Sequence, residues 1–288
     1  MSLPNFLIIG AQRSGTTSLY EYLKQHPQIF MSPVKEPDFF VSTGQQRSDS
    51  PSMVLTMEAY EALFNGVTDE VAIGEASHRY LPSRDARERI AACLPNPKLI
   101  AVLRNPVERG YSHWLHNARN GREPLDFRGA LDAEQERLAS DPLGRFGYVY
   151  TGRYHLHLTG YLQAFAPDQL RVYLFDDLAV DPGAVVKDIF GFLGVDDGFR
   201  PKLERHMVSG LPRGRMGQLY DQLRKSAGAV KVVKRVVPGD VRDRLRERFL
   251  RRPVFPEDVR RHLIACYRDE IHQLEALLRR DLSSWLRA

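Results

Sequence analysis

The pattern of apolar and polar residues divides most of the chain into alternating strands and helices. Short, mainly apolar runs predict buried strands at 6–9, 29–31, 71–77, 99–103 and 170–175. Apolar residues at helical spacing predict helices at 18–24, 58–64, 83–94, 106–117, 127–139, 153–165 and 182–193. This alternation indicates an α/β fold, with a central parallel sheet flanked by helices on both faces.

The chain changes character after about residue 200. Residues 200–217 predict an irregular basic loop, and the sequence from Gln218 is mostly helical, ending in a long amphipathic helix at 256–286. We interpret residues 1–288 as a single domain, with an α/β core at 1–200 and a basic loop and helical extension at 201–288. The segment 224–252 holds eleven Lys and Arg against three Asp and Glu. It is either a solvated basic face or a surface that contacts an anionic membrane or a lipid-linked acceptor.

Composition narrows the classes of partner. The net charge of +5 favours anionic ligands without indicating nucleic acid. Cys93 and Cys266 lie far apart and have neither metal-type spacing nor the pattern of a disulfide framework. The first residues do not have the pattern of a signal peptide. No apolar run approaches the roughly 18 residues of a membrane span, and a Golgi enzyme anchored at its N-terminus needs such a span. We expect a cytoplasmic protein, peripheral to the membrane if segment 224–252 binds one, with no metal site.

The loop after the first strand has the chemistry of an anion site. Gly10-x4-Gly15-x-Thr17 has the spacing of a P-loop, between a strand end and a helix start, where backbone N–H groups and the helix dipole favour an anion. The lysine that reaches the β- and γ-phosphates of a triphosphate is replaced by Thr16, which argues against ATP or GTP. Arg13 can supply the missing charge. Hydroxyl groups come from Ser14, Thr16, Thr17 and Ser18.

Two further strand ends carry polar residues, and strand ends are where such sheets place their functional groups. One is Gly74-Glu-Ala-Ser-His78, and the other begins at Arg104 and includes Ser112 on the following helix. A guanidinium at the strand end and a hydroxyl two helical turns away can grip one phosphate. Two anion sites at neighbouring strand ends favour a nucleotide with phosphates at both ends of its ribose.

These residues carry a family resemblance. Residues 10–19 and 103–114 resemble the two signature motifs of sulfotransferases that use 3′-phosphoadenosine 5′-phosphosulfate (PAPS), in the variant found in heparan-sulfate-type carbohydrate sulfotransferases and their bacterial relatives. Lys35-Glu-Pro-Asp-Phe-Phe40 is similar to the Lys-Glu-x-x-Phe-Phe segment of that group, and residues 74–77 and 281–285 are also similar. The resemblance spans nearly the whole chain and is strongest up to about residue 115.

The resemblance implies donor-binding roles for particular residues. The 3′-phosphate is expected on Arg104 and Ser112. The 5′-phosphosulfate is expected on Arg13, Ser14, Gly15, Thr16, Thr17 and Ser18. A late basic loop that closes over the nucleotide corresponds to Arg213, Gly214 and Arg215. In one departure, several relatives carry a lysine where this chain has Ala76, and His78 or Arg79 can replace that charge.

The resemblance also implies the reaction, which is in-line transfer of a sulfonate to a hydroxyl or amine of a carbohydrate, lipid or small-molecule acceptor. Charge spreads over the equatorial oxygens as in phosphoryl transfer, so Arg13 and backbone N–H groups can suffice without Mg²⁺. Glu36 aligns with the carboxylate proposed as the general base in the heparan-sulfate enzymes. Lys35 can lower the pKa of Glu36 or contact the sulfonate. The alternative bases are Glu75, His78 and His113.

Two other functions compete with this interpretation. The run Val172-Tyr-Leu-Phe-Asp176 resembles a Walker B strand, so the chain could be a small-molecule kinase with Mg²⁺ held by Asp176 and Thr17. Thr16 in place of the lysine argues against that alternative. A non-catalytic nucleotide-binding module would leave Glu36 without a role. The acceptor cannot be read from the sequence, although the loops at 42–56 and 118–152 are expected to shape its pocket.

Overall fold

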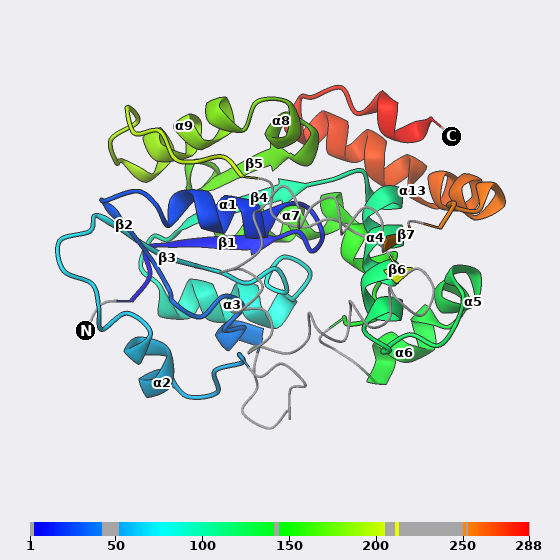
Figure 1. Cartoon of the computed structure of the whole chain (residues 1–288), viewed down its shortest axis with the longest axis horizontal. Coiled ribbons are helices and arrows are strands. Elements are labelled where there is room, and N and C mark those ends of the chain that lie inside the picture. Colours follow the sequence, from blue (N-terminus) through cyan, green and yellow to red (C-terminus); the bar gives the residue numbers. More distant parts are fainter. Residues whose placement is uncertain are drawn as a thin grey trace.

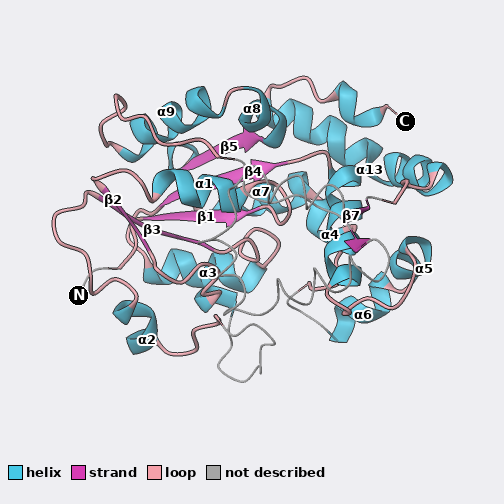
Figure 2. Ribbon diagram, viewed as in Figure 1, coloured by secondary structure: helices cyan, strands magenta, loops and turns pink. Residues whose placement is uncertain are grey.

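The computed structural model describes residues 3–41, 52–140, 144–204, 211–212, 250–251 and 253–287. Within these residues, five parallel strands form a central sheet in the order β2-β3-β1-β4-β5 (Figures 1 and 2). The strands are β1 (Phe6–Gly10), β2 (Ile29–Met31), β3 (Ala72–Ala76), β4 (Lys98–Leu103) and β5 (Leu170–Leu174). All five predicted strands are confirmed, and each observed strand end lies within one residue of the predicted end.

Helices cover both faces of the sheet, as predicted. The helices of the core are α1 (Thr16–Leu23), α2 (Met57–Ala62), α3 (Arg84–Cys93), α4 (Pro106–Arg119), α7 (Tyr154–Ala164), α8 (Phe175–Val180), α9 (Pro182–Leu193) and α13 (Glu257–Leu278). Successive side chains of a strand point to opposite faces, so Leu7 and Ile9 of β1 pack with α3, α4, α7 and α13. Phe6 and Ile8 pack on the other face with α1, α8 and α9. Figure 1 shows α1 and α9 on one side of the sheet and α3 on the other.

Helix α4 begins immediately after β4, and its first residues explain why. The side chain of Asn105 accepts a hydrogen bond from the backbone N–H of Val107 at 3.0 Å, and Pro106 occupies the first helical position. Helix α3 starts in the same way, because the side chain of Ser83 accepts a hydrogen bond from the backbone N–H of Ala86 at 3.1 Å. The cap on α4 holds Arg104 at the junction of strand and helix.

Two predicted helices differ from the structure. The segment 127–139 is two helices, α5 (Phe127–Asp132) and α6 (Glu134–Ser140), rather than one. The last helix, α13, ends at Leu278 because Arg279 adopts a left-handed conformation with φ 51°, and residues 283–286 form a separate 3₁₀ turn. The short strands β6 (Leu211–Pro212) and β7 (Leu250–Arg251) pair with each other. Residues 213–249, which carry most of the predicted basic segment, lie outside the described residues.

Close packing between β1 and β3 depends on Gly74. A Cβ atom at Gly74 would lie 2.2 Å from the Cζ atom of Phe6, so the Phe6 ring occupies the space over the glycine. Phe6 and Gly74 are also partners in the strand register. The glycine therefore allows a large aromatic ring to fill the sheet face beneath α1.

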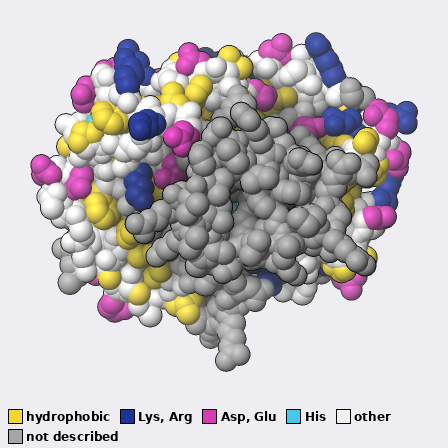
Figure 3. Space-filling model, viewed as in Figure 1, with side chains coloured by type: hydrophobic (Ala, Val, Ile, Leu, Met, Phe, Trp, Pro, Cys, Tyr) yellow, Lys and Arg dark blue, Asp and Glu magenta, His cyan; other side chains and the backbone are white. Residues whose placement is uncertain are grey.

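The described surface carries charges of both signs. In the face shown in Figure 3, basic and acidic side chains alternate around the rim and no single patch of one sign stands out among the coloured atoms. Over the part of the chain that the structure describes, no helix has the length and apolar character that crossing a bilayer requires.

Candidate active site

The carboxyl ends of β1, β3 and β4 meet at one edge of the sheet, because these strands are neighbours and run in the same direction (Figure 2). Backbone hydrogen bonds tie together the segments that follow them. The N–H of Ala11 donates to the carbonyl of Val102 at 2.8 Å, and the N–H groups of Ser77 and Leu81 donate to the carbonyls of Ile8 and Ile9 at 3.0 and 2.9 Å. The three predicted polar strand ends therefore form one site.

The glycine-rich turn leads from β1 into the N-terminus of α1. Gly15 caps this helix in the left-handed region with φ 93°, where a side chain would be strained. Arg13 also has a positive φ of 66°, which is uncommon for a residue other than glycine and is typical of functional turns. The first N–H groups of α1 face this turn, as an anion site requires.

The side chain of Arg13 connects the two predicted anion sites. Its Nε donates a hydrogen bond to the Oγ of Ser112 on α4 at 3.2 Å. The Nη1 of Arg104 donates to the backbone carbonyl of Arg13 at 3.3 Å, and the Arg104 guanidinium lies 4.9 Å from the centre of the Phe175 ring. The two motifs that the sequence analysis singled out therefore share one set of contacts.

The electrostatic potential around Arg13 is positive. Burial, together with the charges of Arg119 and Arg104, lowers the pKa of Arg13 to about 10, which leaves it protonated at neutral pH. Burial and the charges of Arg13 and Arg119 lower the pKa of His116 to about 3. A group of arginines that disfavour one another's charge fits a polyanionic ligand, whose negative charge would relieve that repulsion.

Glu36 lies between Lys35 and the imidazole of His78. Its Oε1 forms an ion pair with Lys35 and lies 3.2 Å from the Nδ1 of His78. Burial raises the pKa of the Glu36 carboxyl, but His78 and Lys35 outweigh burial and hold it below its ordinary value. The carboxyl is therefore ionised at neutral pH. Its side chain is 33% exposed, so an acceptor can reach it.

The sequence analysis missed a second acid in this segment. Asp38, only 1% exposed, accepts a hydrogen bond from the Nη1 of Arg79 at 3.0 Å. Its backbone N–H donates to the Oγ of Ser77 at 3.1 Å. His78 and Arg79, the two residues expected to replace a missing lysine, are thus paired with Glu36 and Asp38. No motif marked Asp38, because its role depends on a partner 41 residues away.

Glu75 lies beneath the site. It is fully buried and accepts hydrogen bonds from the hydroxyls of Ser77 at 2.8 Å and Tyr60 at 3.3 Å. Burial raises the pKa of Glu75 to about 7, against the opposing hydrogen bonds from Tyr80, Ser77 and Tyr60. These contacts fit a structural role for Glu75 at the end of β3 better than its predicted alternative role as a base.

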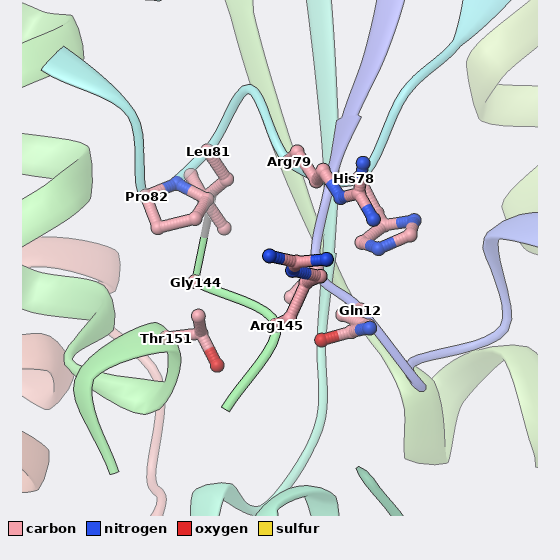
Figure 4. Close-up of a pocket in the computed structure, with 9 residues that line it drawn as sticks. Gln12, His78, Arg79, Leu81, Pro82, Gly144, Arg145 and Thr151 are labelled. Carbon is pink, nitrogen blue, oxygen red and sulfur yellow. The ribbon is translucent and has the colours of Figure 1, made fainter. Parts of the chain in front are cut away.

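A cavity of about 430 Å³ opens beside Glu36 and His78. It is lined by Gln12, Glu36, His78, Arg79, His113, His116, Asn117, Arg122, Arg145 and Phe146. A smaller adjoining cavity of about 10 Å³ shares Gln12, His78, Arg79 and Arg145 with it. Figure 4 shows Gln12, His78, Arg79 and Arg145 on one side of that small cavity, with Leu81, Pro82 and Thr151 on the other.

Part of the cavity wall was predictable. The loop at 118–152 contributes Arg122, Arg145 and Phe146, as expected, whereas residues 42–51 of the other expected loop lie outside the described residues. His113, His116 and Asn117 come from one face of α4. Their i, i+3, i+4 spacing is a helical signal that could have identified His116 and Asn117 from the sequence.

Two further predictions concern other parts of the chain. Arg213, Gly214 and Arg215, the expected closing loop, lie outside the described residues. Asp176, the Walker B candidate, instead accepts a hydrogen bond from the indole N–H of Trp285 at 3.4 Å and so helps to hold the last turn of the chain. No group of three or more His, Cys, Asp or Glu side chains among the described ranges is arranged to hold a metal ion.

The chain is similar to known sulfotransferases. Human bifunctional heparan sulfate N-deacetylase/N-sulfotransferase 3 is 31% identical over 202 residues, which cover 67% of this chain and 22% of that protein. The mouse protein of the same name is 28% identical over 300 residues, which cover 99% of this chain and 31% of that protein. This chain thus spans less than a third of the length of these mammalian relatives.

The structure agrees with the sequence comparison. The crystal structure of a sulfotransferase from Alicyclobacillus acidocaldarius superposes with a TM-score of 0.74 and 32% identity, over the full length of both chains. A sequence model of the sulfotransferase domain matches residues 3–274. Because that match covers nearly the whole chain and the fold agrees, this protein belongs to the sulfotransferase domain family.

Proposed function

We propose that this protein transfers the sulfonate group of PAPS to a hydroxyl or amine of a carbohydrate, with lipid and small-molecule acceptors as further candidates. The contact between Arg13 and Ser112 carries the proposal, because it unites two anion-binding motifs at adjacent strand ends. Sulfotransferase family membership supports the reaction. The relatives named for heparan sulfate favour a glycan acceptor over the other two classes.

We propose the donor-binding residues that the family resemblance implies. Arg13, Ser14, Gly15, Thr16, Thr17 and Ser18 would hold the 5′-phosphosulfate. Arg104 and Ser112 would hold the 3′-phosphate, and Arg213, Gly214 and Arg215 remain predicted as a closing loop. The positive surroundings of Arg13 and the N-terminus of α1 fit this polyanion. When bound, PAPS supplies a sulfonate on the oxygen of its 5′-phosphate, and we propose that no metal ion takes part.

Glu36 would act as the general base. It is ionised, partly exposed and on the cavity wall, so it can receive the proton that an acceptor hydroxyl or amine releases. Lys35 is paired with Glu36, and Arg13 lies close enough to interact electrostatically with Glu36. These two cations would stabilise the negative charge of the sulfonate oxygens during transfer.

The cavity beside Glu36 would receive the acceptor. Its volume of about 430 Å³ is in the range of small-molecule sites, and its wall is mainly polar, as a hydroxyl-rich acceptor needs. We further propose that residues 1–288 act as one domain, with the 201–288 extension packed on the core. A cytoplasmic location, with membrane contact through segment 224–252, remains part of the proposal.

Two measurements test the proposed function. Isothermal titration should show binding of adenosine 3′,5′-bisphosphate without Mg²⁺, and weak or no binding of Mg·ATP. A screen of glycans, amino sugars, phenols and lipid alcohols with sulfur-35-labelled PAPS should then transfer the label. Tight binding of Mg·ATP with no binding of the bisphosphate would instead support the kinase alternative and refute the proposal.

A further inference from the structure

His113 is a buried polar side chain whose hydrogen-bonding capacity the fold leaves unused. It follows Ser112 on α4, is 0% exposed, and has no hydrogen-bond partner on either Nδ1 or Nε2 among the described residues. Buried polar groups are normally paired, and an unpaired one costs free energy. His113 also belongs to the wall of the 430 Å³ cavity. An unpaired imidazole in a cavity wall indicates a partner that enters the cavity.

The position of the ring is fixed by packing. The His113 imidazole meets the Tyr148 ring edge to face, with centroids 4.9 Å apart and planes at 64°. The Tyr148 hydroxyl donates to Glu123 at 2.8 Å and accepts from the amide of Asn117 at 3.0 Å, while Arg137 pairs with Glu123 at 2.6 Å. The Tyr148 hydroxyl, Glu123 and the Asn117 amide each have a partner, whereas neither nitrogen of His113 has one among the described residues.

The chemical state of His113 limits what it can bind. Burial lowers its pKa well below the ordinary value, and the charges of Arg109 and Arg13 act in the same direction. The neutral ring carries one N–H donor and one nitrogen acceptor. A hydroxyl group, which both donates and accepts, matches either nitrogen. A cation matches poorly in such positive surroundings, and a strongly anionic group would find better partners in Arg79 or Arg122 on the same wall.

We propose that His113 is an acceptor-binding residue, whose neutral imidazole hydrogen-bonds an uncharged hydroxyl of the acceptor next to the group that receives the sulfonate. The inference rests on the proposed function and specifies its acceptor as a compound with at least two neighbouring hydroxyl or amine groups. One of these groups faces Glu36 and loses its proton, and the other is held by His113. Ser112, adjacent to His113, contacts Arg13, so this wall adjoins the donor site.

His113 is less suited to be the base than to be a binding residue. Glu36 is 33% exposed and contacts Lys35 and His78, whereas neither nitrogen of His113 has a partner among the described residues that could stabilise a protonated ring. The two roles give different kinetics. Loss of a binding residue should mainly raise KM for the acceptor, while loss of the base should lower kcat.

Two variants separate the hydrogen bond from the packing. His113→Phe keeps an aromatic ring against Tyr148 but removes both nitrogens, and His113→Gln keeps a donor and an acceptor. His272→Gln, at a histidine that is 56% exposed on α13, serves as the control. All three should bind adenosine 3′,5′-bisphosphate within about twofold of the wild type, and circular dichroism melting identifies any variant that fails to fold.

Sulfonate transfer from labelled PAPS to a heparosan hexasaccharide, to glucosamine and to methyl β-glucopyranoside gives the kinetic result. With any probe that the wild type sulfates, His113→Phe should lower kcat/KM roughly 10- to 100-fold, mainly through KM, and His113→Gln should recover most of the loss. An unchanged kcat/KM in a folded His113→Phe protein would overturn the inference, as would an equal loss in both variants.

A crystal structure of the wild type with adenosine 3′,5′-bisphosphate decides the matter even when none of the three probes is sulfated. A water or solute oxygen within about 3.2 Å of a His113 nitrogen, on the cavity side, would support the inference. Nitrogens bonded only to protein atoms would refute it. If no acceptor is sulfated and the bisphosphate does not bind, the proposed function fails, and a structure of the unliganded protein still tests His113 in the same way.

Discussion

The Nε of Arg13 donates a hydrogen bond to the Oγ of Ser112 at 3.2 Å, and this contact joins residues that lie 99 positions apart in the chain. Arg104 reaches the backbone carbonyl of Arg13 from the other side, at 3.3 Å. The glycine-rich turn after β1 and the start of α4 are therefore one structural unit. A substitution in either motif should therefore change ligand binding at the other.

Arg13→Ala should weaken binding of adenosine 3′,5′-bisphosphate by roughly 10- to 100-fold, because it removes charge-assisted hydrogen bonds at the turn. Isothermal titration measures the dissociation constant. Arg84→Ala is a matched control, because Arg84 is 78% exposed and pairs with Glu88 one turn away on α3. Its dissociation constant should stay within about twofold of the wild type.

The contact between Arg13 and Ser112 predicts coupling between the two positions. Ser112→Ala alone should weaken bisphosphate binding by roughly 3- to 10-fold, since a neutral hydrogen bond is lost. In the double variant with Arg13→Ala, the free-energy losses should sum to more than the measured loss, because the two side chains contact each other. Strict additivity of the two losses would show that the motifs act independently.

Glu36→Gln should leave bisphosphate binding within about threefold of the wild type and lower kcat by roughly 10²- to 10⁴-fold, because the amide cannot take the acceptor proton. His78 and Lys35 hold the pKa of the Glu36 carboxyl below its ordinary value, so the wild-type rate should not fall as the pH is lowered to about 5 through loss of this base. Steady-state kinetics between pH 5 and 8 measure both effects. A Glu36→Gln enzyme with full kcat would assign the base to another residue.

Glu75 should make stability depend on pH. Its pKa rises from an ordinary 4.5 to about 7 in the folded protein, mainly through burial. Between these values the native state keeps a proton that the unfolded chain has released, so the free energy of unfolding falls as the pH rises toward 7 and then levels off. We expect this loss to be ~1–3 kcal/mol.

Urea unfolding of the wild type and Glu75→Gln at pH 5 and pH 8 isolates this contribution, because other titrating groups are common to both proteins. Glutamine mimics the protonated carboxyl, so the wild type should lose more stability than the variant between the two pH values. The same pH dependence in both proteins would contradict the assignment to Glu75.

Gly74→Ala should destabilise the fold by ~1–3 kcal/mol or more, because its new Cβ would overlap the Phe6 ring. Phe6→Leu should cost less in the Gly74→Ala background than in the wild type, since the smaller side chain makes room for the methyl group. Thermal or urea unfolding gives both values. Gly191→Ala, on α9, should be neutral or slightly stabilising, because apart from adjacent residues and the helix's own backbone no described atom lies within 4 Å of the added Cβ.

The strands and the two anion motifs were predictable because their signals are local. An apolar run such as Phe6–Ile9 is buried on both faces wherever it is placed in a parallel sheet. The motif residues Arg13 and Ser112 lie in contiguous segments that follow such runs. The cap residues Ser83 and Asn105 act within three positions of themselves, so the starts of α3 and α4 needed no knowledge of the rest of the fold.

The errors and omissions arise from contacts between distant residues. The predicted helix at 127–139 is interrupted at Ala133, and the next residue, Glu134, is buried and accepts hydrogen bonds from the backbone N–H groups of Val149 and Tyr150, both at 2.7 Å. Asp38 is fixed by Arg79, and the carbonyl of Arg145 by the amide of Asn117 at 2.8 Å. None of these pairs has a sequence signal, because each depends on how the loops return to the sheet.

The segment 36–38 is fastened to the end of β3 by neighbouring links, from Glu36 to His78 and to the carbonyl of Ala76, and from Asp38 to Arg79 and Ser77. Attempts to redirect the enzyme to new acceptors should therefore keep these contacts between residues 36–38 and the end of β3. Saturation libraries at Arg122 and Phe146, which line the same cavity from the loop after α4, offer a route to altered selectivity that spares Glu36, the proposed base.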